Sequence, residues 1–234
     1  MLDSLGLSAR DPVERPHVLL NMISTLDGRA SVDGRTRGLG NGADRALFHG
    51  LRARVDAVMV GAGTARTERY GTLVRSPETR RWREDRGLKP LPLAVLVSGR
   101  LDLPEDLPLL QDPESRVVVA TSSADSLPAV PAEVVYLRFE GTVDLERMLR
   151  YLWVIHGVRS LLCEGGPTLN APLLKGGLVD ELFLSFAPLL LGGDAGLRIV
   201  GGPELEPPHE LELLWCLQSG DHLFTRWRVP GSRS

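Results

Sequence analysis

The segment LLCEGGPTLN, residues 161–170, combines a carboxylate, a glycine pair and a hydroxyl in one short stretch. Glu164 ends an apolar run, and a buried carboxylate is costly unless hydrogen-bond donors surround it. The glycines allow backbone N–H groups to approach an anion closely, and a helix that begins after them adds partial positive charge. We therefore expect Gly166 and the amides of Thr168 and Leu169 to face an anion, with the Thr168 hydroxyl as a further donor. Glu164 should accept hydrogen bonds from the hydroxyl or amine groups of a ligand.

Two further glycine-bearing stretches, GAGT at 61–64 and SGR at 98–100, also follow short apolar runs. In open α/β sheets ligands bind beyond the carboxyl ends of the strands, so both stretches are candidates for ligand contact, with Thr64 opening a turn. Each stretch alone fits a plain strand-to-helix connection equally well. The chain has neither GxGxxG nor the phosphate-loop pattern GxxxxGK followed by Ser or Thr.

The sequence offers no pattern for a nucleophile or a metal site. It has no GxSxG, no CxxC and no His-rich cluster. Cys163 and Cys216 lie in apolar runs and are interpreted as small buried hydrophobes, and His17, His49 and His156 as structural residues. We assign no catalytic side chain and no metal, and this pattern favours chemistry carried out by a bound cofactor.

The elements that would position these residues alternate between strands and helices. The clearest helix covers 144–157, with an apolar stripe, Asp144 or Thr142 as its N-cap and Gly157 at its end. Alternation of this kind predicts an α/β fold, with a mostly parallel central sheet, helices on both faces and a C-terminal antiparallel hairpin. We expect strands over 17–24, 56–63, 91–98, 116–122, 132–139, 158–166 and 179–193, helices over 43–55, 144–157 and 167–177, and the hairpin over 209–229.

The stretch 64–90 is polar, charged and punctuated by proline and glycine. Its cluster Arg80, Arg81 and Arg83, followed by acidic residues, is interpreted as a solvated loop. This stretch could mark a domain boundary, but the sheet needs strands from both sides of it. We therefore expect an N-terminal extension over 1–15 and a single domain over 16–230. Pro172 should shorten or kink the helix in which it stands.

Composition excludes several classes of function. A net charge of −3 argues against a nucleic-acid binder, which usually carries a basic face. The N-terminus lacks a basic segment followed by an apolar core, and the apolar run 182–191 is too short to span a bilayer and contains Pro188. We expect a cytoplasmic protein with no membrane partner.

Three stretches, in this order and at this spacing, carry a family resemblance: NMISTLDGRAS (21–31), LRARVDAVMVGAGTARTE (51–68) and LLCEGGPTLNAPLLKGGLVDELFLSFAPLLLGG (161–193). Together they resemble the pyrimidine reductases of riboflavin biosynthesis, typified by 5-amino-6-(5-phosphoribosylamino)uracil reductase, whose fold is dihydrofolate-reductase-like. The resemblance runs from about residue 16 to 228. Nothing resembles the zinc motif of the deaminase that often precedes this reductase, so a stand-alone reductase without zinc is expected.

The resemblance implies NADPH as the cofactor and a 5-amino-6-ribosylamino-pyrimidine 5′-phosphate as the substrate. Its ribosyl group would be reduced to ribityl by hydride transfer to the C1′ imine. A homodimer is also implied. Carried over residue by residue, the cofactor set is Thr64, Ser98, Arg100, Gly166, Pro167, Thr168, Leu169 and Asn170, and the substrate set is Glu164, Arg52, Arg75 and Thr36. Asp27 is interpreted as a turn former rather than a catalytic residue.

One loop departs from the family pattern. Asp-Asn-Pro or Asp-Asp-Pro is usual after the GAGT region, whereas this chain has TERYG at 67–71, with Glu68 where an aspartate is expected. Gly38 also stands where an apolar or aromatic residue is common. Two alternatives therefore stay open: a reductase of the same fold acting on another small substrate, such as a pterin or dihydrofolate, and a non-catalytic NADPH-binding protein.

Overall fold

The computed structural model describes residues 14–193 and 196–231, so most of the expected extension 1–15 lies outside the described residues. The chain divides into two compact units. The first unit contains residues up to His17 and His49–Leu162, and the second contains Val18–Phe48 and the chain from Cys163 onward. The single domain expected over 16–230 stays a prediction.

The first unit is built on parallel strands in the order β5-β4-β3-β2-β6. Strands β2 and β3, β3 and β4, and β4 and β5 pair in parallel. The central runs are buried along almost their whole length, as expected for parallel strands covered on both faces. These strands are β2 (Ala57–Gly61), β3 (Leu93–Val97), β4 (Arg116–Thr121), β5 (Glu133–Arg138) and β6 (Ser160–Cys163).

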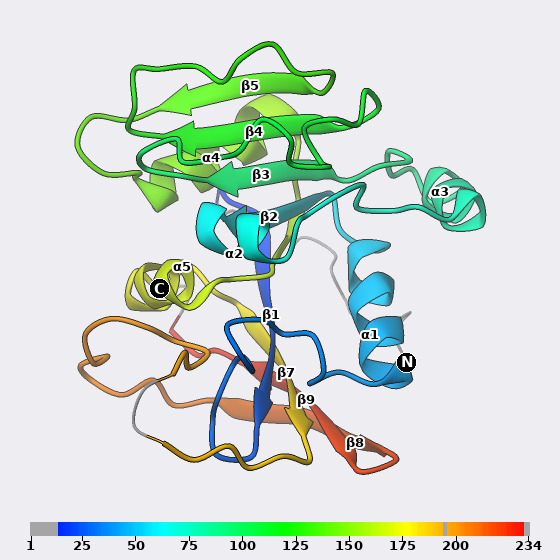
Figure 1. The fold of residues 1–234 in the computed structure, drawn as a ribbon, viewed down its shortest axis with the longest axis vertical. Helices are drawn as coiled ribbons and strands as arrows, with labels where there is room; N and C mark the ends of the chain where they lie inside the picture. The colour runs from blue at the N-terminus through cyan, green and yellow to red at the C-terminus, as the bar shows by residue number, and fades with distance from the viewer. Residues whose placement is uncertain (1–13, 194–195, 232–234) are drawn as a thin grey trace. The chain divides into compact units, whose positions relative to one another are not determined.

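Helices flank this sheet: α2 (Ala62–Thr67) lies in front of it in the view of Figure 1, and α4 (Leu145–His156) lies behind it. The caps of α4 are those that the sequence predicts. Asp144 accepts a hydrogen bond from the Arg147 amide at 2.9 Å, and Gly157 ends the helix with φ +66°. Helix α1 (Gly42–Arg52) contributes its last residues to the first unit.

The arginine cluster expected to be a solvated loop instead forms α3 (Pro77–Glu84), so that prediction was wrong. Ser76 caps the helix by accepting from the Thr79 amide at 3.2 Å, and Pro77 occupies the first turn, where its missing N–H costs nothing. Arg83 is fully buried. Charge alone gave no hint of this burial, because backbone carbonyl groups, not an acidic side chain, surround the guanidinium.

The second unit has the strand order β1-β7-β9-β8. Strands β1 (His17–Thr25) and β7 (Glu181–Ala187) are parallel, and the hairpin β8 (Glu212–Ser219) and β9 (His222–Arg228) adds to β7 in antiparallel fashion. The hairpin and the mostly parallel α/β fold are therefore as predicted. Helix α5 (Pro167–Lys175) continues past Pro172, so the expected early end is not observed.

Buried polar contacts fix the strands of the second unit. Arg226 on β9 forms a two-pronged ion pair with Glu181 on β7, at 2.7 and 2.8 Å. The Val18 amide donates to the Asp180 carboxylate at 2.7 Å.

Cys163 is buried as predicted, but Cys216 is exposed on β8, contrary to the prediction. In the described part of the chain, no helix is long and apolar enough to cross a membrane.

Candidate functional site

The turn between β6 and α5 has a backbone that requires glycine. Gly165 has φ +83°, and a Cβ there would lie 3.1 Å from the Met22 sulfur. The peptide bond between Gly165 and Gly166 is cis. Gly166 is the N-cap of α5 and Pro167 its first residue, with no side-chain cap and no acidic residue in the first turn. The strand therefore leads straight into an uncapped helix N-terminus.

This N-terminus has the properties of an anion site. The Gly166 carbonyl accepts the amides of Leu169 at 2.9 Å and Asn170 at 3.0 Å, which closes the first helical turn. The Leu169 amide, which the sequence predicted to face an anion, is therefore already bonded within the helix, so that part of the prediction was wrong. Thr168, at the second helical position, is exposed, so its hydroxyl is accessible from solvent. The positive end of the helix dipole and the absence of an acidic neighbour both favour a phosphate group. The turn thus fits the cofactor phosphates that the sequence assigns to it.

Asn170, expected in the same set, has its side chain inside the second unit. It is 0% exposed, its amide nitrogen donates to the Ile199 carbonyl at 2.7 Å, and its amide oxygen lies 3.9 Å from the Cys163 sulfur. Leu169 is buried as well. These two side chains form the buried part of the turn, and Gly166, Pro167 and Thr168 form its accessible part.

A second glycine-rich segment lies against this turn, and the sequence analysis did not identify it. The Gly201 amide donates to the Pro167 carbonyl at 3.1 Å. A Cβ at Gly201 would lie 3.2 Å from the Pro167 Cβ, so a larger residue would press on the start of α5. The pair Gly201-Gly202 after the apolar residues Ile199 and Val200 was the available signal.

Glu164, at the end of β6, is only 6% exposed. Burial, with a smaller contribution from the Glu164 charge, raises the pKa of the neighbouring Cys163 thiol to about 12. The thiol therefore stays protonated at neutral pH and is a poor nucleophile, as the sequence analysis assumed. The described residues contain no group of three or more potential metal ligands.

Asp27 is held by the backbone of a distant loop. Its carboxylate accepts the amides of Leu191 at 3.0 Å and Gly192 at 2.6 Å, and it is bonded to the Thr25 hydroxyl. Those hydrogen bonds, the Thr25 one first, lower the pKa of Asp27 to about 2. Arg29 donates to the Gly192 carbonyl at 2.7 Å and completes the connection. This supports the interpretation of Asp27 as a residue that holds the loop.

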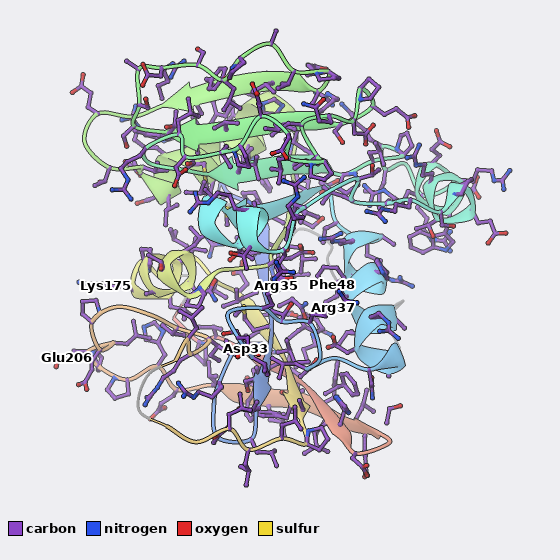
Figure 2. All side chains as sticks on the ribbon, in the orientation of Figure 1. Asp33, Arg35, Arg37, Phe48, Lys175 and Glu206 are labelled. Atoms are coloured by element: carbon purple, nitrogen blue, oxygen red, sulfur yellow. The ribbon has the colours of Figure 1, made fainter. Side chains whose placement is uncertain are left out.

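Thr36 lies in the loop that follows β1 and contains Asp27, and it is exposed. A bridge between Val32 and Arg35, with both hydrogen bonds at 2.9 Å, and a bond from the Leu39 amide to the Thr36 carbonyl shape the loop around it. Its neighbours in the sequence, Arg35 and Arg37, are both exposed and are labelled in Figure 2. The sequence analysis passed over these arginines, although RTR is a recognisable signal for an anionic ligand.

In the first unit, the structure brings Thr64 and Ser98 to one edge of the sheet. Gly61 pairs with Val97, and Val97 pairs with Ala120, so the residues after β2, β3 and β4 leave the sheet at the same level. Ser98 is buried and Arg100 is exposed. Thr64 stands inside α2 and does not open a turn, because Gly61 already caps a helix there.

The same edge carries a polar residue that the sequence analysis missed. The Ser122 hydroxyl, just beyond β4, is buried and has no hydrogen-bond partner among the described residues. The Ser122 amide and the Thr121 hydroxyl donate to the Gly99 carbonyl at 3.0 and 3.2 Å and fix the turn that holds Arg100. A buried hydroxyl without a partner suits a ligand contact.

Arg52 and Arg75, the arginines assigned to the substrate, both lie against residues of the unusual loop 67–71. The Arg52 guanidinium lies over the Tyr70 ring, 5.3 Å from its centroid. A Cβ at Gly71 would lie 3.2 Å from an Arg75 nitrogen, so the Arg75 side chain covers Gly71. Tyr70 is buried, and its amide donates to the Ala65 carbonyl at 3.0 Å. The residues that depart from the family pattern are therefore ordered, and the Tyr70 ring among them supports the Arg52 guanidinium.

Arg83 binds the backbone at the end of α1, which carries Arg52. Its Nη1 donates to the carbonyls of Arg52, Ala53 and Val55 at 3.0, 2.9 and 2.9 Å, and its Nε donates to the backbone carbonyl of Lys89 at 2.8 Å. Burial lowers the pKa of Arg83 to about 10, so it remains charged at neutral pH. The guanidinium caps the C-terminal end of α1, where a positive charge is favourable.

Comparison with known proteins shows which family this chain is similar to. The sequence model of a protein family, described as the RibD C-terminal domain, matches residues 16–224 of this chain. A 2,5-diamino-6-ribosylamino-4(3H)-pyrimidinone 5′-phosphate reductase from Archaeoglobus fulgidus is 36% identical over 185 residues, covering 76% of this chain and 83% of that protein. One of the same name from Methanothermobacter thermautotrophicus is 32% identical over 228 residues, covering 93% and 100%. A solved pyrimidine reductase-like protein from Corynebacterium diphtheriae shares the fold, with a TM-score of 0.78, 24% identity and 92% of each chain covered.

Proposed function

Because this chain belongs to the RibD C-terminal domain family, we propose that it is an NADPH-dependent reductase of riboflavin biosynthesis. One observation carries the proposal: the chain aligns with the whole of a stand-alone reductase, at 32% identity over 228 residues. The uncapped helix N-terminus after Gly166 supports it, since it offers the type of site that a dinucleotide phosphate needs.

The relatives refine the substrate. The name of these two relatives specifies a 2,5-diamino-pyrimidinone, whereas the sequence resemblance suggested the deaminated uracil. We propose the diamino-pyrimidinone ribosylamine phosphate as the first substrate and the 5-amino uracil as the second candidate. The two differ at one ring substituent, so the distinction is a matter of hydrogen bonding to the ring.

Bound NADPH would supply the hydride that converts the ribosyl imine carbon to ribityl. The protein would hold the cofactor through two sets of residues. In the second unit, Gly166, Pro167 and Thr168 would contact its phosphates, and Leu169 and Asn170 would contribute to this contact by fixing the turn. In the first unit, the contacts would be Thr64, Ser98 and Arg100, with the Ser122 hydroxyl as an addition.

For the substrate, Glu164 would accept hydrogen bonds from hydroxyl or amine groups. Arg52 and Arg75 would bind its phosphate, because a guanidinium pairs with phosphate through two parallel N–H donors. Thr36 would add a hydroxyl, and the exposed Arg35 and Arg37 would extend the positive charge of its loop.

We also propose a homodimer and a cytoplasmic location. The dimer is supported by apolar side chains that the second unit leaves exposed at two places: the loop after β7, and the hairpin β8–β9 with the residue just before it. They are Leu189, Leu190 and Leu191 in the loop, and Leu211, Leu213 and Leu223 in or beside the hairpin. Exposed apolar side chains that form a contiguous patch mark an interaction surface. The cytoplasm follows from the biosynthetic reaction proposed here.

The experiment incubates the purified chain and NADPH with each of three compounds: the diamino-pyrimidinone ribosylamine phosphate, its deaminated uracil counterpart and dihydrofolate. Loss of reduced-nicotinamide absorbance with the first compound, and slower loss with the second, is the expected result. Turnover of dihydrofolate alone would select a reductase of another substrate. NADPH binding without any turnover would select a non-catalytic binding protein.

A further inference from the structure

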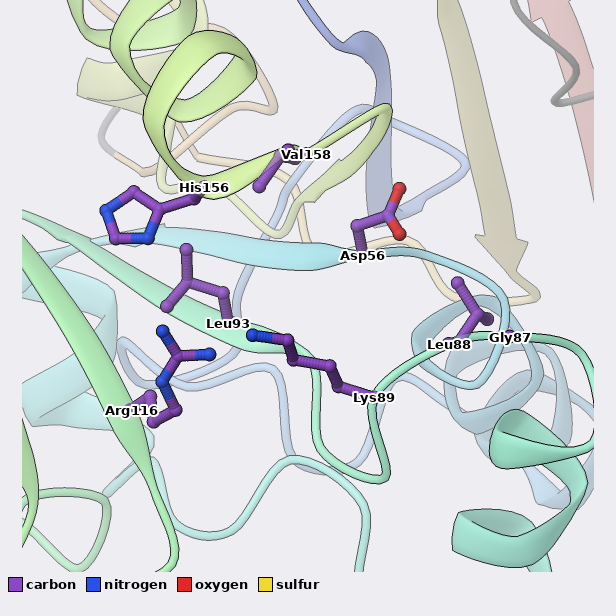
Figure 3. Close-up of a pocket in the computed structure, with 9 residues that line it drawn as sticks. Asp56, Gly87, Leu88, Lys89, Leu93, Arg116, His156 and Val158 are labelled. Carbon is purple, nitrogen blue, oxygen red and sulfur yellow. The ribbon is translucent and has the colours of Figure 1, made fainter.

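The first unit contains a cavity of about 180 Å³ at the edge of the sheet opposite to Thr64 and Ser98. It lies at the amino-terminal ends of the strands: Leu93 begins β3, Arg116 begins β4, and Asp56 directly precedes β2. The cavity is also lined by Lys89 and by His156, the last residue of α4 (Figure 3). The proposed reductase site uses the carboxyl ends of the same strands, so this cavity plays no part in it.

Three nitrogen-bearing side chains gather at this cavity. Figure 3 shows the Lys89 ammonium, the Arg116 guanidinium and the His156 imidazole around Leu93. The Nε2 atom of His156 is buried and has no hydrogen-bond partner among the described residues. The ring is supported edge-on by Tyr151, at 5.4 Å between centroids. A buried ring nitrogen without a partner is costly, and a ligand that accepts its proton would remove that cost.

The acidic residues nearby do not neutralise this group. The Asp56 carboxylate accepts three donors of its own chain: the amides of Arg159 and Ser160 at 3.0 and 2.8 Å, and the Ser160 hydroxyl at 2.8 Å. Glu133 approaches Arg116 at 3.5 Å, but its side chain is 63% exposed, so water screens the pair. The cavity therefore keeps an excess of positive charge and of hydrogen-bond donors.

We propose that this cavity is a binding site for a small oxyanion of the phosphate class, either inorganic phosphate or the end of a phosphomonoester. Arg116 would offer a two-pronged contact, Lys89 a point charge, and His156 the donor at Nε2. The volume suffices, because a cavity of about 150 Å³ already accommodates a molecule the size of benzene.

The charges also predict how binding depends on pH. Burial first, and then the charges of Arg116 and Lys89, lower the pKa of His156, while Glu133 raises it. Asp56 is the remaining charged group at the cavity. An anion would offset the two cations and raise the pKa of His156, and by linkage it binds more tightly as the pH falls and His156 becomes protonated. The position of His156 at the end of α4 also favours its protonated form.

The test titrates the full-length chain with inorganic phosphate and, separately, with glycerol phosphate, and follows the His156 ring signals by NMR. Saturable shifts and a higher His156 pKa in the bound form are expected. The tighter of the two ligands identifies whether free phosphate or a phosphomonoester is the occupant. If neither ligand moves the His156 signals in a saturable way, the proposal is overturned.

Variants localise the binding. Arg116→Gln and Lys89→Ala should each weaken phosphate binding about tenfold, the loss of one charge-assisted contact. Arg147→Gln, an exposed change on α4, is the matched control and should leave binding unchanged. Equal affinity in all three variants would contradict the cavity as the site. Because the signal belongs to His156, the result holds whether or not the chain proves to be a reductase.

Discussion

The Nη1 atom of Arg83 donates a hydrogen bond to the backbone carbonyl of Arg52 at 3.0 Å. A buried arginine on α3 thus holds the last residue of α1, the residue whose side chain we assign to the substrate phosphate. Arg52 in turn lies over the Tyr70 ring. One chain of contacts in the first unit therefore sets the position of the proposed substrate arginine from both its backbone and its side chain.

Arg83→Met should destabilise the protein by about 3 kcal/mol or more, since it leaves several buried carbonyls without a donor. The measurement is the free energy of unfolding in urea. Arg81→Met, an exposed change on the same helix, is the control and should lie within about 0.5 kcal/mol of the parent protein. If both variants lose the same stability, Arg83 is not a structural anchor.

Tyr70→Leu should raise the KM for the pyrimidine substrate about fivefold, because a cation–π contact of about 1 kcal/mol no longer orients Arg52. NADPH affinity should not change. Tyr70→Phe keeps the ring and should retain the KM of the parent protein. Initial rates at varied substrate concentration decide the matter, and a normal KM in the leucine variant would show that Tyr70 does not position Arg52.

The sequence predicted the strands and helices well where apolar periodicity and caps were clear, as at Asp144 and Gly157 around α4. It failed at α3, because a helix that buries an arginine against carbonyls has no apolar stripe to reveal it. It identified the turn after Glu164 from its glycines. It did not identify Ser122 or Gly201, because their importance depends on neighbours brought close only by folding.

Thr168→Val and Glu164→Gln should each impair the use of a different ligand. The valine variant loses a hydroxyl donor and should weaken NADPH binding about tenfold, as expected for one hydrogen bond to a charged group. The glutamine variant should bind NADPH normally but lose most of its kcat/KM for the pyrimidine. Fluorescence titration of NADPH and steady-state rates measure the two effects. Equal losses of both properties in either variant would contradict the assignment.

Asp27 should make stability depend on pH. Hydrogen bonds from Thr25 and Gly192 lower the pKa of Asp27 from 3.8 to about 2 in the folded chain. Its stabilising contribution is therefore complete above the unfolded pKa of 3.8 and is lost as the pH falls through about 2. Asp27→Asn should lower the Tm at neutral pH and flatten its fall in acid.

The control for this prediction is Asp33→Asn on the same loop. Asp33 is exposed and has φ +49°, a conformation that asparagine adopts as readily as aspartate. This variant should follow the parent protein at every pH in thermal unfolding monitored by circular dichroism. An Asp27→Asn curve that coincides with it would show that the contacts of Asp27 with Leu191 and Gly192 do not stabilise the loop.

The most direct test of the reductase uses NADPH labelled with deuterium at the transferable position of the nicotinamide. With the diamino-pyrimidinone ribosylamine phosphate, we expect a ribityl product that carries one deuterium at C1′, detected by mass spectrometry and NMR, and one NADPH consumed for each product molecule. Glu164→Gln should form this product far more slowly, with the label at the same carbon. NADPH binding with no deuterium in any pyrimidine product would show that the chain is not this reductase.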